Sequence, residues 1–107
     1  MLRVPVAVTH SSLVRRDVKL IDTVRQLDGL PTEHTIYVRH PWSTVSESAV
    51  AEEGSGEEKR LRSEGLSYFL EVFIAKDFLD AWKGTMKQVP TDDQLCTRLI
   101  EYASNDA

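Results

Sequence analysis

The chain has 107 residues, with 13 lysines and arginines against 17 aspartates and glutamates, three histidines and one cysteine. This length allows one domain, and a net charge of −4 argues against a protein that binds nucleic-acid phosphates through clustered cations. A single cysteine excludes an internal disulfide and a cysteine-rich zinc site. The apolar runs are shorter than the ~18 residues of a membrane-spanning helix. We therefore expect a globular domain that binds neither nucleic acid nor membranes.

The first 16 residues are interpreted as an N-terminal extension or an edge strand before a single domain at residues 17–107. Apolar side chains alternate with others along the first eight residues, and Pro5, which has no amide N–H, confines a strand here to a sheet edge. The apolar core of this segment is too short for a signal peptide. Together with the unpaired Cys96, this predicts a cytoplasmic protein.

The first helix is predicted to begin at Asp17, whose carboxylate can accept hydrogen bonds from the free amides of the first turn. Gly29 is placed at its C-terminal end, and Pro31 prevents it from continuing. A start near Ser12 is the alternative. The apolar stripe, spaced by three and four residues, comprises Val18, Leu20, Ile21, Val24 and Leu27.

Two strands are predicted next. Residues 35–39 are rich in β-branched and aromatic side chains, and their alternation places Ile36 and Val38 on one face and Tyr37 on the other. Residues 44–50 form a weaker strand that we expect to pair antiparallel with the first. The polar residues 52–57, which include two glycines, are predicted to form a loop.

Helical turns are expected at residues 58–64, ended by Gly65. Residues 68–74 form the most apolar run and are predicted to be a buried central strand. A helix over residues 75–86 follows, and Thr91 and Gln94 have the spacing of a capping box that opens a last helix.

Strands and helices are clustered rather than alternating, which favours an α+β fold. We expect an antiparallel sheet of about three strands, with a fourth edge strand if the N-terminus joins it, packed against about three helices.

Few residues suggest catalysis. His34 and His40 stand at the two ends of strand 35–39, about 20 Å apart by strand rise, too far to share a metal ion. Cys96 lies on the apolar stripe of the last helix, where burial makes a thiol inert. The serines within residues 43–48 lack the glycines of a nucleophile elbow. We therefore expect no metal and no cofactor, and find little positive support for an enzyme.

Charge is distributed unevenly along the chain. Residues 1–40 contain six basic and four acidic side chains, a net charge of +2. Residues 41–107 contain seven basic and thirteen acidic side chains, a net charge of −6. The acidic part can steer the domain toward a basic partner, although solubility alone also accounts for it.

The sequence also resembles a known family, through Tyr37-Val38, Pro41-Trp42-Ser43, Gly65-Leu66 and the final Asn105-Asp106-Ala107. Their order is similar to that of a family of small acidic bacterial proteins without an assigned function, over about residues 18–107. The resemblance implies one α+β domain and no reaction. Ser46 and Ser48 depart from it, since acidic residues or threonine are common there. Small bacterial domains of this kind include immunity and accessory proteins of toxin and mobile-element loci.

The leading hypothesis is a non-catalytic protein-interaction module, with an immunity-like inhibitor that masks a basic partner as its most specific form. Tryptophan is over-represented in interface hot spots, and Trp42 follows a proline that ends a strand. Tyr37 and Arg39 would join it in one patch unless helices cover both faces of the sheet. The predicted interaction residues are Tyr37, Arg39, Trp42, Glu52 and Glu53.

Two alternatives belong to other classes. A small-ligand-binding or hydrolytic domain would use a pocket that joins His40 and Glu47. A self-associating structural protein would pair through residues 69–74 or through the last helix.

Overall fold

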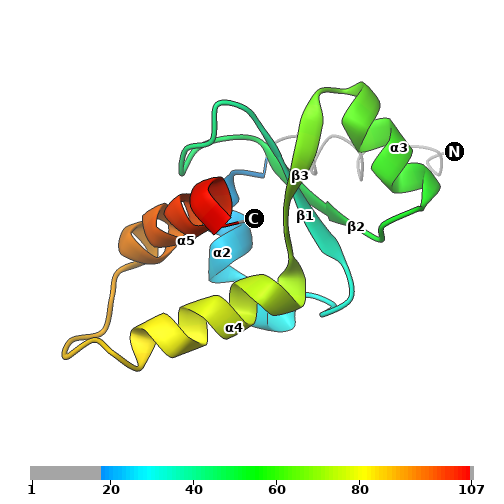
Figure 1. Cartoon of the computed structure of the whole chain (residues 1–107). Coiled ribbons are helices and arrows are strands. Elements are labelled where there is room, and N and C mark those ends of the chain that lie inside the picture. The colour runs from blue at the N-terminus through cyan, green and yellow to red at the C-terminus, as the bar shows by residue number, and fades with distance from the viewer. Residues whose placement is uncertain (1–17, 107) are drawn as a thin grey trace, which may run out of the picture.

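The computed structural model describes residues 18–106, and its elements form the predicted α+β fold (Figure 1). The expected extension or edge strand at residues 1–16 lies outside the described residues. No helix in the part of the chain that is described is long and apolar enough to cross a membrane. In chain order the elements are α2 (Leu20–Arg25), the 3₁₀ helix η1 (Leu27–Gly29), β1 (Thr35–Arg39), β2 (Ser48–Ala51), α3 (Gly56–Ser63), β3 (Leu66–Glu71), α4 (Val72–Lys83) and α5 (Asp92–Asp106).

The three strands form one antiparallel sheet in the order β2-β1-β3. Tyr37, at the middle of β1, is opposite Ala49 on one side and Tyr68 on the other. Helices α2, α4 and α5 lie on one face of this sheet, and α3 lies on the other (Figure 1). Both faces of the sheet are therefore covered.

The main hydrophobic core lies between the sheet and the layer of three helices. Ile36 and Val38 point into it from β1, as their alternation predicted, and both are fully buried. Cys96 and Leu99 meet them from α5 and are fully buried as well. The expected inward position of Cys96 is confirmed.

A second, smaller core lies beneath α3. Tyr37 points into it from the opposite face of β1, and Leu61 is the buried apolar side chain that α3 contributes. Ala49, Ala51 and Leu66 complete it. A helix with one buried apolar residue has a weak hydrophobic pattern, which is why the sequence did not indicate that α3 covers this face.

The helix predicted to start at Asp17 is α2, which begins at Leu20, so the predicted start is wrong; Asp17 and Ser12 themselves lie outside the described residues. Val18 is extended, and its carbonyl accepts a hydrogen bond from the amide of Ser48 at 2.9 Å. The first amides of α2 also find distant partners, because Leu20 N–H donates to the Ser46 carbonyl at 2.8 Å. These long-range backbone bonds replace the side-chain cap that a local pattern suggests.

Two strand predictions also need correction. The strand expected at residues 68–74 is β3, which ends at Glu71 and lies at a sheet edge rather than in the centre. Val72 begins α4 instead, where its amide donates to the His34 carbonyl at 2.9 Å. The strand expected at residues 44–50 is β2, which is antiparallel to β1 as predicted but begins at Ser48. Residues 44–46 form a turn instead, and the Thr44 and Ser46 carbonyls accept hydrogen bonds from amides of α2.

The predicted capping box is confirmed. Gln94 N–H donates to Thr91 Oγ1 at 3.1 Å, and Thr91 N–H donates to Gln94 Oε1 at 2.8 Å. This capping box fixes the start of α5, the second helix of the hairpin that α4 and α5 form (Figure 1).

Candidate functional site

The predicted interaction patch does not form, because Tyr37 is fully buried and Trp42 lies on the opposite side of the sheet. Tyr37 has no exposed surface and packs beneath α3, with the guanidinium of Arg62 5.6 Å from its ring centroid. Trp42 packs on the opposite side, against the main core. The patch was expected only if one face of the sheet stayed open, and helices cover both faces.

Arg39 and Glu47 form an ion pair at the end of β1. The Arg39 Nη2 and Nε atoms lie 2.9 and 3.0 Å from Glu47 Oε1. Glu47 is not among the described residues that line the cavity beside His40. The pocket that was expected to join His40 and Glu47 therefore holds only the first of them.

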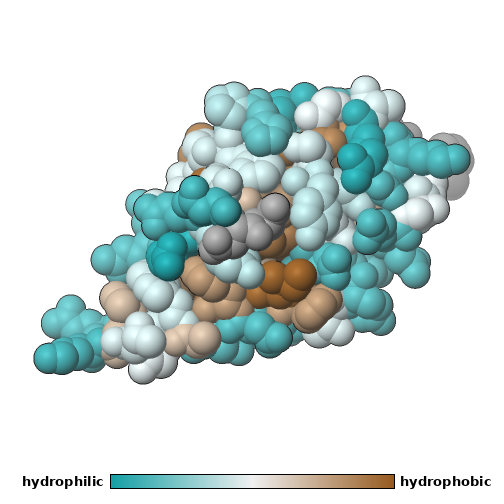
Figure 2. Space-filling view, in the orientation of Figure 1, coloured by the Kyte–Doolittle hydropathy of each residue, from teal (hydrophilic) through white to brown (hydrophobic). Residues whose placement is uncertain are grey.

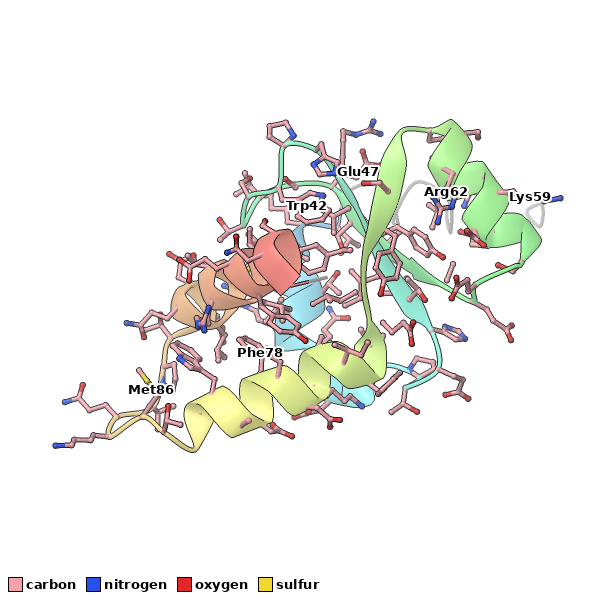
Figure 3. All side chains as sticks on the ribbon, in the orientation of Figure 1. Trp42, Glu47, Lys59, Arg62, Phe78 and Met86 are labelled. Carbon is pink, nitrogen blue, oxygen red and sulfur yellow. The ribbon has the colours of Figure 1, made fainter. Side chains whose placement is uncertain are left out.

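Trp42 is the centre of an aromatic cluster at the edge of the sheet. The imidazole of His40 stacks on its indole with centroids 4.4 Å apart, and Phe69 meets it edge-on at 4.9 Å. The indole Nε1 donates to the Val38 carbonyl at 3.4 Å. Trp42 is half-buried, and Figure 3 places it above the C-terminal end of α5.

A cavity of about 570 Å³ opens beside this cluster. It lies between the segment that joins β1 to β2, the edge strand β3 and the last turn of α5. Its described lining residues are His40, Pro41, Trp42, Tyr68, Phe69, Ala103 and Ser104. This volume is within the range typical of small-ligand sites.

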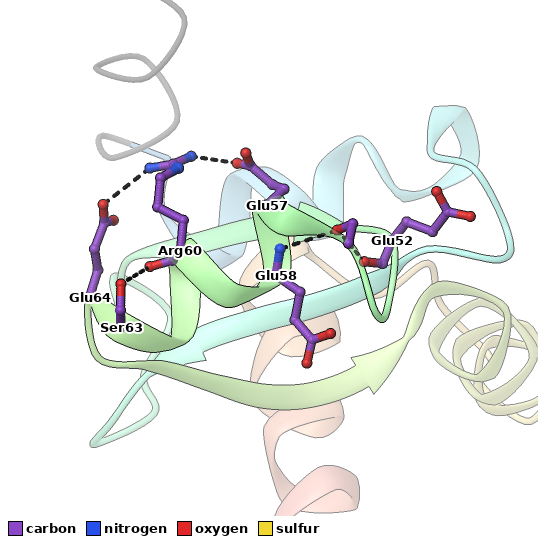
Figure 4. A network of polar contacts seen from close by, with 7 residues as sticks. Glu52, Glu57, Glu58, Arg60, Ser63 and Glu64 are labelled. Atoms are coloured by element: carbon purple, nitrogen blue, oxygen red, sulfur yellow. Dashed lines mark hydrogen bonds and ion pairs between the residues drawn. The ribbon is translucent and has the colours of Figure 1, made fainter.

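Glu52 and Glu53 are exposed on the loop before α3, apart from both the aromatic cluster and the groove described below. On α3 itself, Arg60 bridges two glutamates, Glu57 and Glu64 (Figure 4). Glu58 accepts bonds from the Gly54 amide and from Arg62, and these lower the pKa of its carboxyl. Paired charges therefore make up much of the acidic region that the sequence indicated.

A second hollow, which the sequence analysis missed, is a groove of about 340 Å³ between α4 and α5. Phe78 of α4 stacks on Tyr102 of α5 at 4.2 Å, and the guanidinium of Arg98 lies 5.1 Å from the Phe78 centroid. Beyond this pair the groove is lined by Trp82, Met86, Asp93, Gln94, Thr97, Arg98 and Glu101.

Trp82 and Met86 are the apolar residues that line this groove, and Met86 is 38% exposed. Phe73, at the start of α4 and outside the described lining, is 45% exposed. In Figure 2 brown apolar atoms gather in a band between α4 and α5, and Figure 3 shows Met86 at the end of the hairpin. Ile74, Phe78 and Trp82 of α4 follow each other at intervals of four, a second apolar ridge beside the buried one at Val72, Ala75 and Leu79; Met86 comes three residues after α4 ends. An apolar arc this wide is the signal that could have identified the groove.

The groups available for catalysis are few. Within residues 18–106, no group of three histidine, cysteine or carboxylate side chains could hold a metal ion. Burial raises the pKa of the Cys96 thiol to about 12, which leaves it protonated and unreactive at neutral pH.

Comparison of the chain with protein-family models, with curated proteins and with solved structures gave no match. The resemblance to small acidic bacterial proteins therefore stays a prediction.

Proposed function

We propose that this protein is a non-catalytic protein-interaction module whose contact surface is the groove between α4 and α5. The observation that supports the proposal is the ridge of large apolar side chains left half-covered on this face, with Met86 exposed beside it. Contiguous apolar surface rimmed by polar residues is typical of protein-binding sites. Aromatic residues and methionine are enriched in the centres of such sites.

The rim of the groove favours a basic partner. Asp93 and Glu101 line it, and the one basic side chain among its described lining residues, Arg98, lies 3.3 Å from Glu101. The protein as a whole has a net charge of −4. An amphipathic helix with apolar residues spaced by three and four, flanked by lysine or arginine, would complement this surface. An immunity-like inhibitor that masks such a segment is the specific form of the function that we propose.

The test is capture of partners from the native host by the tagged protein and by two matched variants. Met86→Lys introduces a charge into the groove, and Val45→Lys makes the same change at a residue that is 63% exposed in the turn before β2. We expect a stoichiometric partner that is lost with Met86→Lys and retained with Val45→Lys. A partner that both variants retain would show that the groove is not its binding surface.

Self-association through the same face is the competing outcome. Sedimentation of the purified protein would then show a dimer that dissociates in the Met86→Lys variant. A strict monomer removes this alternative and leaves the basic partner. A cytoplasmic location belongs to the same proposal, and the single cysteine, buried as a free thiol, is consistent with it.

Binding of a small ligand is the second candidate function, favoured by the cavity of about 570 Å³ beside His40 and Trp42. A screen of neutral, cationic and anionic ring compounds by ¹H–¹⁵N NMR tests it directly. We expect some of them to shift the Trp42 indole resonance. Failure of every compound, whatever its charge, would contradict ligand binding at this cavity.

A further inference from the structure

We propose that the cavity beside Trp42 is a site for an organic cation, such as a quaternary ammonium or a guanidinium group. The inference rests on the second candidate function, ligand binding, and names its ligand chemistry. It is independent of the α4–α5 groove, because none of the described residues that line the cavity also lines the groove.

Four of the seven described lining residues of the cavity are aromatic. The imidazole of His40 stacks on one face of the Trp42 indole, and both side chains line the cavity. Tyr68 lines it from β3, and its side chain also packs against the second core beneath α3. Phe69 is fully buried and supports Trp42 from behind. Because the indole N–H is turned inward to the Val38 carbonyl, Trp42 offers ring surface rather than a donor to a ligand. Ring faces attract cations through their quadrupole, and tryptophan does so most strongly.

The remaining wall of the cavity, at the C-terminal end of α5, has the partial negative charge that suits a cation. Ala103 and Ser104 belong to the last turn of α5, which ends at Asp106. The final carbonyl groups of a helix have no intrahelical partners and form the negative end of its dipole. Among the described lining residues there is no lysine or arginine that would repel a cation.

These features select a weakly hydrated cation. A compact ammonium ion keeps its water strongly, whereas methyl groups or a planar guanidinium spread the charge over a surface that can pack on rings. The same chemistry can come from a free small molecule or from a side chain of a protein partner. Choline represents the first source, and N-acetyl-arginine amide represents the second.

The experiment titrates each compound into the full chain and follows the Trp42 indole and Ser104 amide resonances by NMR. The control ligand is 3,3-dimethylbutanol, the neutral isostere of choline. We expect choline or the arginine amide to bind about fivefold to thirtyfold more tightly than this alcohol, the range of one cation–π contact. Stronger binding of choline would identify a free ammonium ligand, and stronger binding of the arginine amide would identify a partner side chain.

Two pairs of variants locate the site. Trp42→Leu should abolish the preference for the cation, whereas Trp82→Leu, in the groove, should leave it unchanged. Because Trp42→Leu also disturbs the core, Ser104→Lys provides a second test: it puts a competing cation at the exposed cavity wall, and Thr97→Lys is its match earlier on α5. We expect only Ser104→Lys to abolish binding.

Equal affinity for choline and its neutral isostere would overturn the cation proposal and leave ligand binding intact. Loss of cation binding in Thr97→Lys as well as in Ser104→Lys would also overturn it, because the effect would then be one of net charge. Failure of both cations to shift either resonance, while neutral or anionic ring compounds do so, would assign the cavity to another ligand class.

Discussion

The guanidinium of Arg39 occupies the space beside Gly65 that a side chain there would need, since a Cβ atom at Gly65 would lie 2.5 Å from Arg39 Nη1. Gly65 also has a φ of +97°, a left-handed conformation that side chains disfavour. Gly65 connects α3 to β3, and the Arg39 side chain that lies beside it is paired with Glu47.

Replacement of Gly65 by alanine should lower the free energy of unfolding by about 1–2 kcal/mol, the cost of a Cβ in left-handed backbone. Arg39 can swing away from the new methyl group, and loss of its half-exposed ion pair with Glu47 adds little. Urea denaturation measures the effect. Gly54→Ala is the comparison for the backbone cost alone. Gly54 is also left-handed, with a φ of +86°, but no atom lies within 4 Å of a Cβ built there. Wild-type stability in Gly65→Ala would contradict the argument.

The capping box gives the second prediction. Thr91→Ala should destabilise the protein by about 1 kcal/mol, because the Gln94 amide loses its acceptor. The double variant should lose less free energy of unfolding than the sum of the losses in Thr91→Ala and Gln94→Ala, since the two side chains act as one unit. Thr97→Ala, in the middle of α5, should change stability little. Additive effects of the two cap variants would argue against a reciprocal cap.

The starts of α2 and α5 show which helix boundaries can be predicted from the sequence. The cap of α5 is local, since Thr91 and Gln94 are three residues apart, and it was predicted to the residue. The start of α2 depends on carbonyl groups at residues 44–46, more than twenty positions away. No local pattern contains that information.

The candidate site shows the same division. The alternation of β1 correctly placed Ile36 and Val38 together, but whether Tyr37 faces solvent depended on α3, whose single buried apolar residue is Leu61. The groove was hidden for a related reason. Phe78 and Trp82 are apolar residues of an amphipathic helix, and periodicity alone cannot tell a covered face from one left half-exposed.

Tyr37 supports a third prediction, in the direction opposite to most core substitutions. Its hydroxyl group is buried beneath α3 beside the Thr35 hydroxyl, and neither hydroxyl makes a well-formed hydrogen bond within the described residues. Tyr37→Phe removes an unpaired polar atom at almost constant volume, so stability should stay unchanged or rise by up to about 1 kcal/mol. Leu61→Ala, which empties the same small core, should cost about 2–5 kcal/mol. A large loss in Tyr37→Phe would show that the hydroxyl is bonded.

Cys96 provides a pH prediction. Burial raises the pKa of its thiol from the usual 9 to about 12, so the folded protein holds the proton more tightly than the unfolded chain. The stabilising contribution of this group is full below pH 9 and is lost as the pH rises from 9 toward 12. Ellman's reagent at pH 8 should therefore react with Cys96 in urea but not in the native state. Rapid reaction of the native protein would contradict its burial in α5.

The rim of the groove distinguishes the two acidic surfaces considered for a basic partner. Neutralising Asp93 and Glu101 together, as Asn and Gln, should weaken the captured partner roughly fivefold and flatten the salt dependence of its association rate, as expected for two exposed rim charges. Neutralising Glu52 and Glu53 in the same way is the matched control, because it removes the same charge from an exposed loop away from the groove. Surface plasmon resonance at several salt concentrations compares the two variants. A larger effect in the loop variant would move the interface to the loop before α3, where the sequence first placed it.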